Sequence, residues 1–474
     1  MEKAFLVTTP IYYVNDFPHI GSAYPTLVAD VIARQKRKEG YRVHFSTGTD
    51  EHGVKNLQAA KYANKDVRIF TDEVSAKFKA TWERLNISFD DFIRTTEPRH
   101  TQAVLYFIEK LKDSGHIYQG MYKGLYCIGC EMFKEGSELV EGLCPIHQRK
   151  AEYVEEKNWF FRVSAFTDKL KGLIESDAIT IEPAGKKAET LGLLKIWIND
   201  VSISREHLSW GIPLPFDKEQ TIYVWVDALI NYLTTIGYPD ERYKEFWPNV
   251  LHIIGKDILK HHAIIWPALL LAIGLEPPKR IFAHSFFTVE GQKMSKSLGN
   301  VITPDELIKK FGVDGARYVL LAEISGDKDN DISWQKFQAR YDADLKHNIG
   351  NIFSRLLVLA QKNDIKTLPT TNYSLQTNNH QKTFQEEIEK LNIAQALREA
   401  QAIFEEINKY LDAAKPWKET DKEKIATTLS ESFSAFLDAI DLLEPVLPAT
   451  AKQVLPIKKG DALIVPKENI HLFS

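Results

Sequence analysis

Two short segments far apart in the chain each follow an apolar strand pattern and carry residue types that suit phosphate. Residues 19–22, His-Ile-Gly-Ser, open a predicted helix just after a strand at residues 4–8. Residues 293–297, Lys-Met-Ser-Lys-Ser, form a polar loop just after a strand at residues 280–287. Open α/β sheets bind ligands outside the carboxyl ends of their strands. A helix start that contains glycine presents N–H groups and a positive dipole end to anions. The two segments therefore predict a parallel sheet that binds a polyphosphate at its edge.

The predicted parallel sheet begins at the N-terminus and is interrupted once. Strand patterns at residues 4–8 and 43–46 flank an amphipathic helix at about residues 25–39, which makes one βαβ unit. Residues 115–221 are different, with many glycine and aromatic residues, short strands and all three cysteines. Strand patterns of the parallel type then resume. We interpret the middle segment as an insertion that splits a Rossmann-type nucleotide-binding fold into two halves.

The last third of the chain changes to helical patterns. From about residue 339, apolar residues such as Leu345, Ile349 and Ile352 recur at helical spacing. A polar stretch at residues 363–382 is predicted to be a flexible loop between helices. The segment is therefore expected to be an all-α bundle.

Composition limits the classes of function. The chain has 474 residues, which suits roughly two to four domains, and 44% of them are hydrophobic, which allows buried cores. The net charge of −4 does not indicate nucleic-acid binding, so any contact with RNA has to come from local patches. The longest apolar stretch, residues 263–274, is too short to cross a membrane, and the N-terminus lacks a signal-peptide pattern. We expect a cytoplasmic protein without membrane contact.

The three cysteines and one histidine form two closely spaced pairs. Cys127 and Cys130 make a C-x2-C pair, and Cys144 and His147 make a C-x2-H pair, with thirteen residues between the two pairs. Each pair can point two ligands at one ion, which predicts a tetrahedral zinc site. The alternatives are unrelated buried thiols with a surface histidine, or a disulfide, which would leave one thiol unpaired and does not suit the cytosol. Protein fills all four positions, so the zinc ion is predicted to be structural.

Five further motifs carry a resemblance to a known family. They are T-T-P-I-Y-Y, G-T-D-E-H-G, Y-V-W-V-D-A, I-G-K-D-I and G-Q-K-M-S-K-S-L-G-N, in this order along the chain. Together they resemble the methionyl-tRNA synthetases, class I aminoacyl-tRNA synthetases, in the form with a single zinc knuckle. The lysine loop matches the family's KMSKS signature completely. The HIGH signature is matched in part, because Ser22 stands in place of its closing histidine.

The resemblance implies three sets of site residues. The methionine pocket would be lined by Ile11, Tyr13, Trp225, Ala228, Tyr232, Ile258 and His262, with Asp50 binding the α-ammonium group. ATP would be held by His19, Gly21, Ser22, Gly255, Asp257, Lys293, Met294, Ser295, Lys296 and Ser297, of which His19, Ser22, Lys293 and Lys296 would act in catalysis. Asn351, Arg355 and Trp417 would read the CAU anticodon by hydrogen bonding and stacking. Taken singly, each aromatic or histidine could equally be a core residue.

The resemblance also implies a domain order and a reaction. The domains would be residues 1–114 (Rossmann catalytic domain, first half), 115–221 (insertion with the zinc knuckle), 222–287 (second half), 288–338 (KMSKS loop and stem-contact region) and 339–474 (helical anticodon-binding domain). The enzyme would form methionyl-adenylate from L-methionine and ATP, with Mg²⁺ accompanying ATP, and then transfer methionine to the terminal ribose of tRNA(Met). Catalysis would come from positioning and from charge stabilisation on the phosphates. Because the chain lacks the C-terminal dimerising domain of many relatives, a monomer is expected.

Other functions stay open at this point. A class I synthetase for cysteine, isoleucine or valine is one, although the insertion is too small for the large editing domain of the branched-chain enzymes. A smaller nucleotidyltransferase is a second, but it would lack the helical bundle. A catalytically inactive, synthetase-like RNA-binding protein is a third, and Ser22 alone favours it. Methionine-dependent exchange between ATP and pyrophosphate separates these functions.

Overall fold

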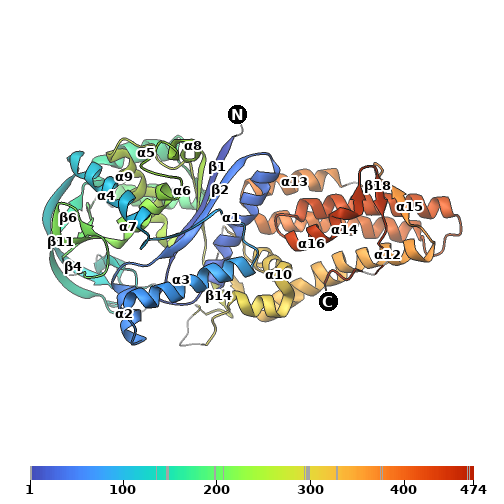
Figure 1. Cartoon of the computed structure of the whole chain (residues 1–474), viewed down its shortest axis with the longest axis horizontal. Coiled ribbons are helices and arrows are strands. Elements are labelled where there is room, and N and C mark those ends of the chain that lie inside the picture. The colour runs from blue at the N-terminus through green and yellow to red at the C-terminus, as the bar shows by residue number, and fades with distance from the viewer. Residues whose placement is uncertain are drawn as a thin grey trace. The chain divides into compact units, whose positions relative to one another are not determined.

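The computed structural model describes residues 3–473 apart from 135, 146–148, 197–198, 207, 293, 295–298, 327–328, 374, 376, 467 and 469. The chain forms two compact units (Figure 1). The first consists of residues 1–18, 36–81 and 88–284, and the second of residues 19–35, 82–87 and 285–474.

A six-stranded parallel sheet is the main sheet of the first unit. Its strand order is β3 (Asp91–Arg94), β2 (Arg42–Asp50), β1 (Ala4–Tyr13), β12 (Val250–Gly255), β13 (Arg280–His284) and β7 (Thr180–Glu182). All neighbouring strands run parallel. The central strands are apolar runs whose side chains are buried on both faces, as Leu6, Val7 and Ile253 illustrate. The predicted parallel sheet is confirmed.

Two strands of this sheet differ from the expectation. β1 continues past Thr8 to Tyr13, with a register shift between Thr8 and Ile11. Pro10 lies within that shift and has no N–H to donate to the ladder. β7 lies inside the predicted insertion, yet it pairs with β13 at the edge of the main sheet. A strand of three residues is too short to leave a periodic pattern in the sequence.

Antiparallel strands form two smaller sheets in the insertion. Strands β5 (Met132–Lys134), β4 (Ile117–Cys127), β6 (Glu152–Phe161) and β8 (Val201–Ser202) make the first, and β10 (Pro213–Leu214), β11 (Asp217–Ile222) and β9 (Ser204–Arg205) make the second, each in that order. Aromatic rings pair across β4 and β6, where Tyr118 stacks on Phe160 with centroids 5.7 Å apart. β4 ends at Cys127, so this hairpin carries the cysteine-bearing turn.

Helices complete the first unit. They are α2 (Val54–Tyr62), α3 (Val67–Arg84, to residue 81), α4 (Pro98–Asp113), α5 (Thr167–Glu175), α6 (Ala184–Ile196), α7 (Val224–Thr234), α8 (Tyr243–Phe246) and α9 (Trp266–Ala272). Helices α4, α7 and α9 share one apolar core with the strands. In it Phe107 stacks on Trp266, with centroids 5.9 Å apart. Because α7 is held by this core, the polar and aromatic residues of its first turns have fixed positions.

The second unit is mainly helical. It contains residues 20–35 of α1 (Ile20–Lys38), α10 (Pro304–Glu323), α11 (Trp334–Arg340), the π-helical segment Tyr341–Gly350, α12 (Asn351–Lys362), α13 (Asn378–Glu389), α14 (Ile393–Ala414), α15 (Lys422–Leu443) and α16 (Pro448–Val454). Short strands are β14 (Phe287–Val289) beside β15 (Asn330–Ile332), and β16 (Thr367–Pro369), β18 (Ala462–Ile464) and β17 (Lys458–Lys459). The rings of Phe353 and Phe404 lie 5.3 Å and 5.5 Å from that of Phe436. The predicted helical bundle is confirmed.

The prediction of a flexible loop at residues 363–382 is wrong over part of that stretch. β16 pairs with β18 there, and α13 begins at Asn378. Leu368 is buried, and the carbonyl of Pro369 accepts a hydrogen bond from the Ser430 hydroxyl. One buried leucine among polar residues is too weak a pattern to predict a strand.

Among the described residues, no helix combines the length and the apolar character needed to cross a membrane.

Candidate active site and zinc knuckle

Hydrogen bonds close the turn at the start of α1. The His19 N–H donates to Oγ of Ser22 at 3.2 Å, and that hydroxyl donates back to the His19 carbonyl at 2.8 Å. The Gly21 N–H donates to Nδ1 of His19 at 3.0 Å. Because Nδ1 accepts this bond, the proton of a neutral His19 ring is on Nε2, which makes that nitrogen a donor. The turn thus combines a histidine N–H donor with a helix start, while the Ser22 hydroxyl is used inside the turn.

Gly21 and Met294 bring the two predicted phosphate-binding segments together. A side-chain carbon at position 21 would lie 2.6 Å from Cε1 of His19 and 3.6 Å from Cε of Met294. The Ile20 N–H also donates to the carbonyl of Ile302, just beyond the lysine loop, at 3.1 Å. Glycine is needed here because any side chain would displace the His19 ring. The remaining predicted residues of the loop, Lys293, Ser295, Lys296 and Ser297, lie outside the described residues, so their roles stay predictions.

Aromatic residues of the first unit gather where the methionine pocket is predicted. The rings of Tyr13 and Trp225 meet edge to face with centroids 6.0 Å apart, and Trp225 stacks on His261 with centroids 4.0 Å apart. Tyr13 ends β1, whereas Trp225, Ala228 and Tyr232 follow one another along α7. Steps of three and four residues place all three on one face of that helix. The structure therefore brings residues from a strand end and a helix start to one place.

Tyr232 and His262, both predicted to line the methionine pocket, are joined by a hydrogen bond whose direction depends on the protonation state of His262. Nδ1 of His262 lies 2.9 Å from the Ile258 carbonyl, and Nε2 lies 2.7 Å from the Tyr232 hydroxyl. A carbonyl only accepts, so Nδ1 carries the proton. Burial lowers the His262 pKa to about 4, which keeps the ring neutral near pH 7, and Tyr232 then donates to Nε2. Uncharged aromatic side chains suit a thioether.

Asp50 supplies negative charge beside Tyr13, its neighbour in the β1–β2 register. The carboxylate is buried, and its Oδ1 has no hydrogen-bond partner among the described residues. Burial raises the Asp50 pKa, and the charges of Asp227 and Glu131 raise it further. A buried carboxylate with an unpaired oxygen is stabilised by a cation. The site therefore fits the ammonium group of an amino acid.

Gly255 and Asp257, both predicted to hold ATP, lie next to each other at the end of β12. A side-chain carbon at Gly255 would lie 2.6 Å from Oδ1 of Asp257. A side chain at position 255 would therefore displace the Asp257 carboxylate from this position. Ile11 and Ile258 are each half-buried.

Two histidines hold Asp227, a role that sequence reasoning missed. Nδ1 of His52 lies 2.7 Å from Oδ2 of Asp227, and Nε2 of His100 lies 2.8 Å from Oδ1. Burial acts to raise the Asp227 pKa, but the two histidines lower it to about 2. His52 and Asp227 belong to two of the quoted motifs, and this membership was the one sequence feature that could have indicated a role for them. His100 stands in no motif, so only the fold could reveal it.

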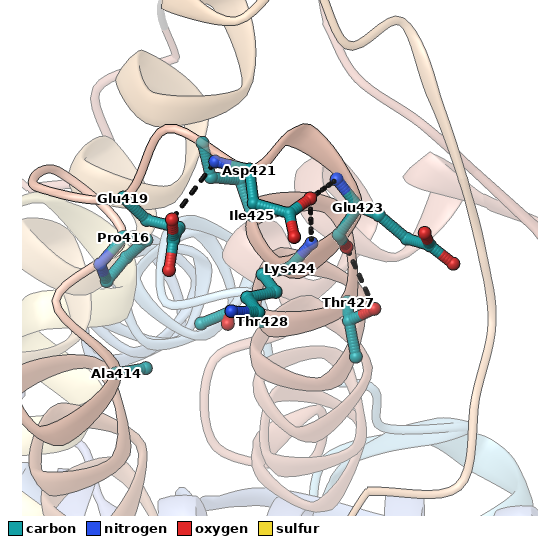
Figure 2. Close-up of a pocket in the computed structure, with 9 residues that line it drawn as sticks. All are labelled: Ala414, Pro416, Glu419, Asp421, Glu423, Lys424, Ile425, Thr427 and Thr428. Atoms are coloured by element: carbon teal, nitrogen blue, oxygen red, sulfur yellow. Dashed lines mark hydrogen bonds between the residues drawn. The ribbon is translucent and has the colours of Figure 1, made fainter.

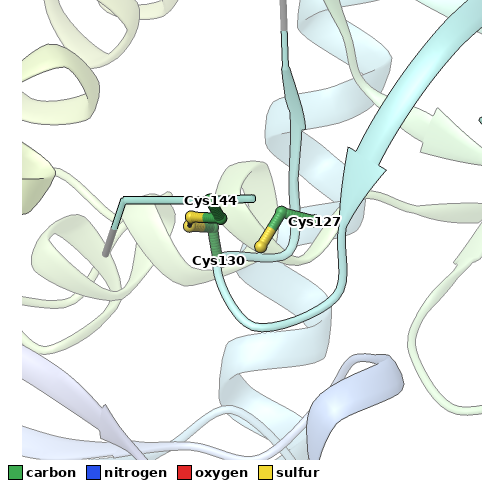
Figure 3. Close-up of side chains that lie close together, drawn as sticks. All are labelled: Cys127, Cys130 and Cys144. Atoms are coloured by element: carbon green, nitrogen blue, oxygen red, sulfur yellow. Dashed lines mark hydrogen bonds between the residues drawn. The ribbon is translucent and has the colours of Figure 1, made fainter. Parts of the chain in front are cut away.

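The three cysteines lie together at the turn after β4 (Figure 3). Their sulfur atoms are within 4.8 Å of one another, and Sγ of Cys130 is 3.5 Å from Sγ of Cys144. Zn–S bonds of about 2.3 Å in a tetrahedral site separate the sulfurs by roughly 3.8 Å. The cluster therefore fits a zinc ion, and no disulfide joins Cys127, Cys130 or Cys144. His147, the fourth predicted ligand, lies outside the described residues.

The cysteine turn is hydrogen-bonded to the predicted methionine pocket. The indole N–H of Trp225 donates to the Cys130 carbonyl at 3.2 Å, and the Tyr223 hydroxyl donates to the Glu131 carbonyl. The Glu131 carboxylate accepts a hydrogen bond from the Lys55 N–H at 2.8 Å. A metal ion that stiffens this turn would therefore also hold one wall of the pocket.

A cavity of about 530 Å³ is lined by residues of the β4–β6 hairpin and by Trp225 and His261. Aromatic rings such as those of Tyr118 and Phe160 line it, together with Lys134. Among its described lining residues, Trp225 alone is also predicted to line the methionine pocket. The cavity and the predicted pocket therefore share the Trp225 side chain.

Two of the three predicted anticodon-reading residues meet in the second unit. The guanidinium carbon of Arg355 lies 5.3 Å from the ring centroid of Trp417, and the Trp417 side chain is 42% exposed. Asn351 is exposed and lies four residues before Arg355 on α12, so both are on one face. An exposed indole beside a guanidinium offers the stacking surface and donors that suit an unstacked base.

A second cavity, also of about 530 Å³, opens at the N-terminus of α15 beside Pro416 (Figure 2). Carboxylates dominate its lining, which includes Glu419, Asp421 and Glu423, and Lys424 is the one cation among the described lining residues. Asp421 caps α15 by accepting hydrogen bonds from the N–H groups of Glu423 and Lys424. Negative charge of this kind is unfavourable for phosphate, so the cavity does not suit the RNA backbone.

Comparison with known proteins decides the family. The family described as tRNA synthetases class I (M) matches residues 5–152 and 130–357, and the anticodon-binding domain of tRNA ligase matches residues 374–472. This chain belongs to the methionyl-tRNA synthetases. The methionine–tRNA ligase of Thermotoga maritima is 42% identical over 95% of this chain and 74% of its own length. That of Rickettsia felis is 41% identical over 99% of this chain and 93% of its own length.

Solved structures of a methionyl-tRNA synthetase from Mycobacterium tuberculosis agree with this assignment. The complex with methionyl-adenylate matches this chain with a TM-score of 0.94 and 34% identity, and the match covers 99% of each chain. The free form has a TM-score of 0.83 and 31% identity, with 99% of each chain covered. As a methionyl-tRNA synthetase, the chain is a class I aminoacyl-tRNA synthetase, an enzyme that joins methionine to tRNA. The Rossmann-type sheet, the cysteine-bearing insertion and the anticodon-binding bundle predicted for this family are all present.

Proposed function

We propose that the chain activates L-methionine with ATP, releasing pyrophosphate, and transfers methionine from the adenylate to the 3′-terminal ribose of tRNA(Met). The observation that supports this most directly is the buried carboxylate of Asp50, with its unpaired oxygen, next to Tyr13. Family membership supports the reaction class, and the aromatic group around Trp225 supports methionine as the amino acid.

In the first step the methionine carboxylate attacks the α-phosphate of ATP in line, and pyrophosphate leaves. The nucleophile is already ionised, so no general base is needed. Asp50 would bind the α-ammonium group, and the neutral Tyr232–His262 pair would adjoin the thioether end. The Nε2–H of His19 and the side chains of Lys293 and Lys296 would stabilise charge on the phosphates, together with the Mg²⁺ that accompanies ATP.

In the second step the terminal ribose 2′-hydroxyl of the tRNA attacks the adenylate carbonyl, and AMP leaves. Selection of tRNA(Met) would depend on the CAU anticodon, read by Asn351, Arg355 and Trp417. The proximity of Arg355 to an exposed Trp417 supports this role, because stacking and donor groups are the means by which single-stranded bases are recognised.

Cys127, Cys130, Cys144 and His147 are proposed to hold one structural zinc ion. When bound, the ion supplies a cross-link within the turn and no chemistry of its own. A cytoplasmic location and a monomeric state are also part of the proposal, and size-exclusion chromatography with light scattering tests the second of these.

Methionine-dependent exchange of pyrophosphate into ATP tests the activity. The wild-type chain should exchange with methionine and not with cysteine, isoleucine or valine. Lys296→Ala should lower the exchange rate at least ~100-fold while the affinity for methionine changes little, because the lysine acts on charge that develops on the phosphates. Lys309→Ala, an equal loss of charge at an exposed position on α10, is the control. No exchange in the wild type would instead favour an inactive RNA-binding protein.

Charging of tRNA tests the anticodon role separately. Trp417→Ala should reduce aminoacylation of tRNA(Met) while methionine-dependent exchange is preserved. Equal losses in both assays would contradict the anticodon role and leave the first step untouched.

A further inference from the structure

An unbroken run of side-chain hydrogen bonds begins at Arg355. Its Nη1 donates to Oδ1 of Asn408 at 3.0 Å, and Nδ2 of Asn408 donates to Oδ1 of Asn348 at 3.0 Å. Nδ2 of Asn348 then donates to Oε1 of Gln401 at 2.8 Å. Three amide side chains on two helices are therefore linked one after another to the guanidinium group.

The run ends on α10 and the π-helical segment. Nε2 of Gln401 donates to the Tyr318 hydroxyl at 2.8 Å, and this hydroxyl donates to Oδ2 of Asp344, also at 2.8 Å. Tyr318 is fully buried. Arg340 lies 3.4 Å from the same oxygen of Asp344 and is itself paired with Glu323. The last acceptor is thus a carboxylate that a cation stabilises.

The two ends set the direction of every bond between them. The Arg355 guanidinium can only donate, and at the other end the Tyr318 hydroxyl donates to the Asp344 carboxyl oxygen. Each amide must therefore accept through its oxygen and donate through its nitrogen in the same sense. Rotating any one amide by half a turn would break the bonds on both of its sides. Hydrogen bonds aligned in this way polarise and strengthen one another.

The spacing of these residues along their helices explains how the run forms. Asn348 and Arg355 are seven residues apart on the continuous helical segment that leads into α12, and Gln401 and Asn408 are seven residues apart on α14. Seven residues are close to two turns of an α-helix, so Gln401 and Asn408 lie on one face of α14. The hydrogen bonds place Asn348 and Arg355 opposite that face. The polar faces meet each other, and the amides between them are half-buried.

We propose that Asn348, Gln401, Asn408 and Tyr318 are positioning residues for tRNA selection, which hold the Arg355 guanidinium over Trp417 and connect it to α10. The inference rests on the proposed anticodon role of Arg355 and Trp417. The side chain of Arg355 is 29% exposed, and a free arginine there would have many rotamers to lose on binding a base. Holding it in place before the base arrives removes that cost.

The second anchor of Arg355 is weak by comparison. Nη2 lies 3.1 Å from Oδ1 of Asp412, a carboxylate that is 66% exposed. Exposed pairs of this kind contribute little. The amide run is therefore the main restraint on the guanidinium, and it connects this group to α10. That helix begins at the capping box of Thr303 and Glu306, directly after the lysine loop.

Two variants interrupt the run near Tyr318 and nearly keep the shape of the side chain: the first removes both bonds of the Tyr318 hydroxyl, and the second removes the donor of Gln401. Tyr318→Phe removes the hydroxyl that joins Gln401 to Asp344, and Gln401→Glu keeps the acceptor for Asn348 but removes the donor to Tyr318. Tyr373→Phe is the matched control, because the Tyr373 hydroxyl accepts from Gln381 at 2.9 Å and donates to Asp438 at 3.1 Å, outside the run. Gln401 is half-buried, so its variant remains informative if Tyr318→Phe folds poorly.

The readout is anticodon discrimination, the ratio of kcat/KM for a tRNA(Met) transcript with CAU to that for a transcript with an altered anticodon. Both variants should lower this ratio ~3- to 10-fold, the effect of one hydrogen bond, while methionine-dependent exchange stays within about 2-fold of the wild type. Tyr373→Phe should change neither. In an Arg355→Ala background, Tyr318→Phe should cause no further loss, because the two act as a unit.

Three results would overturn the inference. Equal losses from Tyr318→Phe with and without Arg355 would show that the hydroxyl does not act through the guanidinium. A parallel loss of methionine-dependent exchange would show a general structural role. If Arg355→Ala itself left discrimination unchanged, the proposed anticodon role would fail first, and the positioning role would fall with it.

Discussion

Nη2 of Arg317 lies 2.6 Å from Oδ2 of Asp30, and neither side chain is exposed to solvent. The other N–H groups of the arginine donate to the carbonyls of Leu85, Pro445 and Val446. One buried side chain on α10 therefore joins α1, the segment at residues 82–87 and the turn that follows α15. The helix that follows the lysine loop is thus bonded to the helix that begins at His19.

Arg317→Leu should lower the free energy of unfolding of the second unit by about 3–5 kcal/mol, because it leaves the Asp30 carboxylate buried without its main partner. Calorimetric unfolding measures this loss. Arg34→Leu is the control: Arg34 also pairs with Asp30, at 2.9 Å, but is 15% exposed, and its loss should cost only about 1 kcal/mol. Similar small losses in both variants would contradict the central role of Arg317.

Asp50→Asn should raise the KM for methionine roughly 10- to 100-fold, since a neutral amide cannot pair with the α-ammonium group. The KM for ATP is the internal control and should change little. The raised pKa of Asp50 adds a pH signature: as pH falls through that pKa, the carboxyl group is neutralised and the KM for methionine rises. This rise should be absent in the variant. An unchanged KM for methionine in Asp50→Asn would exclude the proposed ammonium site.

Cys130→Ser should reduce bound zinc to well below one ion per chain, as measured by elemental analysis of the purified protein. Because the Cys130 carbonyl accepts from the Trp225 indole, the variant should also raise the KM for methionine. Removing zinc from the wild-type protein with a strong chelator should reproduce both effects. A variant that retains one zinc ion would show that Cys130 is not a ligand.

The contribution of His262 to stability should rise with pH between about 4 and 6.5, because the His262 pKa is lowered to about 4 in the folded protein and returns to about 6.5 on unfolding. In this window the unfolded chain binds the proton and the folded chain does not, so raising the pH favours folding. One such group contributes roughly 3 kcal/mol over the window. His262→Gln should reduce the increase in Tm between pH 4.5 and 7. Burial also lowers the pKa values of His252 and His261, which act in the same direction, whereas the raised pKa values of Asp50 and Glu131 act in the opposite direction.

The sequence allowed candidate roles to be predicted for residues inside contiguous motifs, but it did not allow their hydrogen-bond partners elsewhere in the chain to be predicted. Tyr13 and Asp50 belong to short segments at strand ends, where residue type and position already indicate a role. His100 stands in an ordinary amphipathic helix, and its bond to Asp227 depends on how α4 and α7 come together. Roles for Arg355 and Trp417 were expected from the family, whereas their contact and the amide run behind it were not.

The amino-acid sequence by itself determined the parallel sheet, the cysteine pairs, the helical bundle and the chemistry of the motifs, since these depend on residue type and on spacing within a few turns or one strand. Only the tertiary structure decided that β7 joins the main sheet, that two histidines hold Asp227, and that Arg317 reaches Asp30. Such contacts join residues far apart in the chain, and a single polar residue produces no periodic sequence pattern from which its partner could be predicted. The packing of the surrounding apolar faces decides which polar groups come together, and a charge buried by this packing is stable only beside a group of opposite charge.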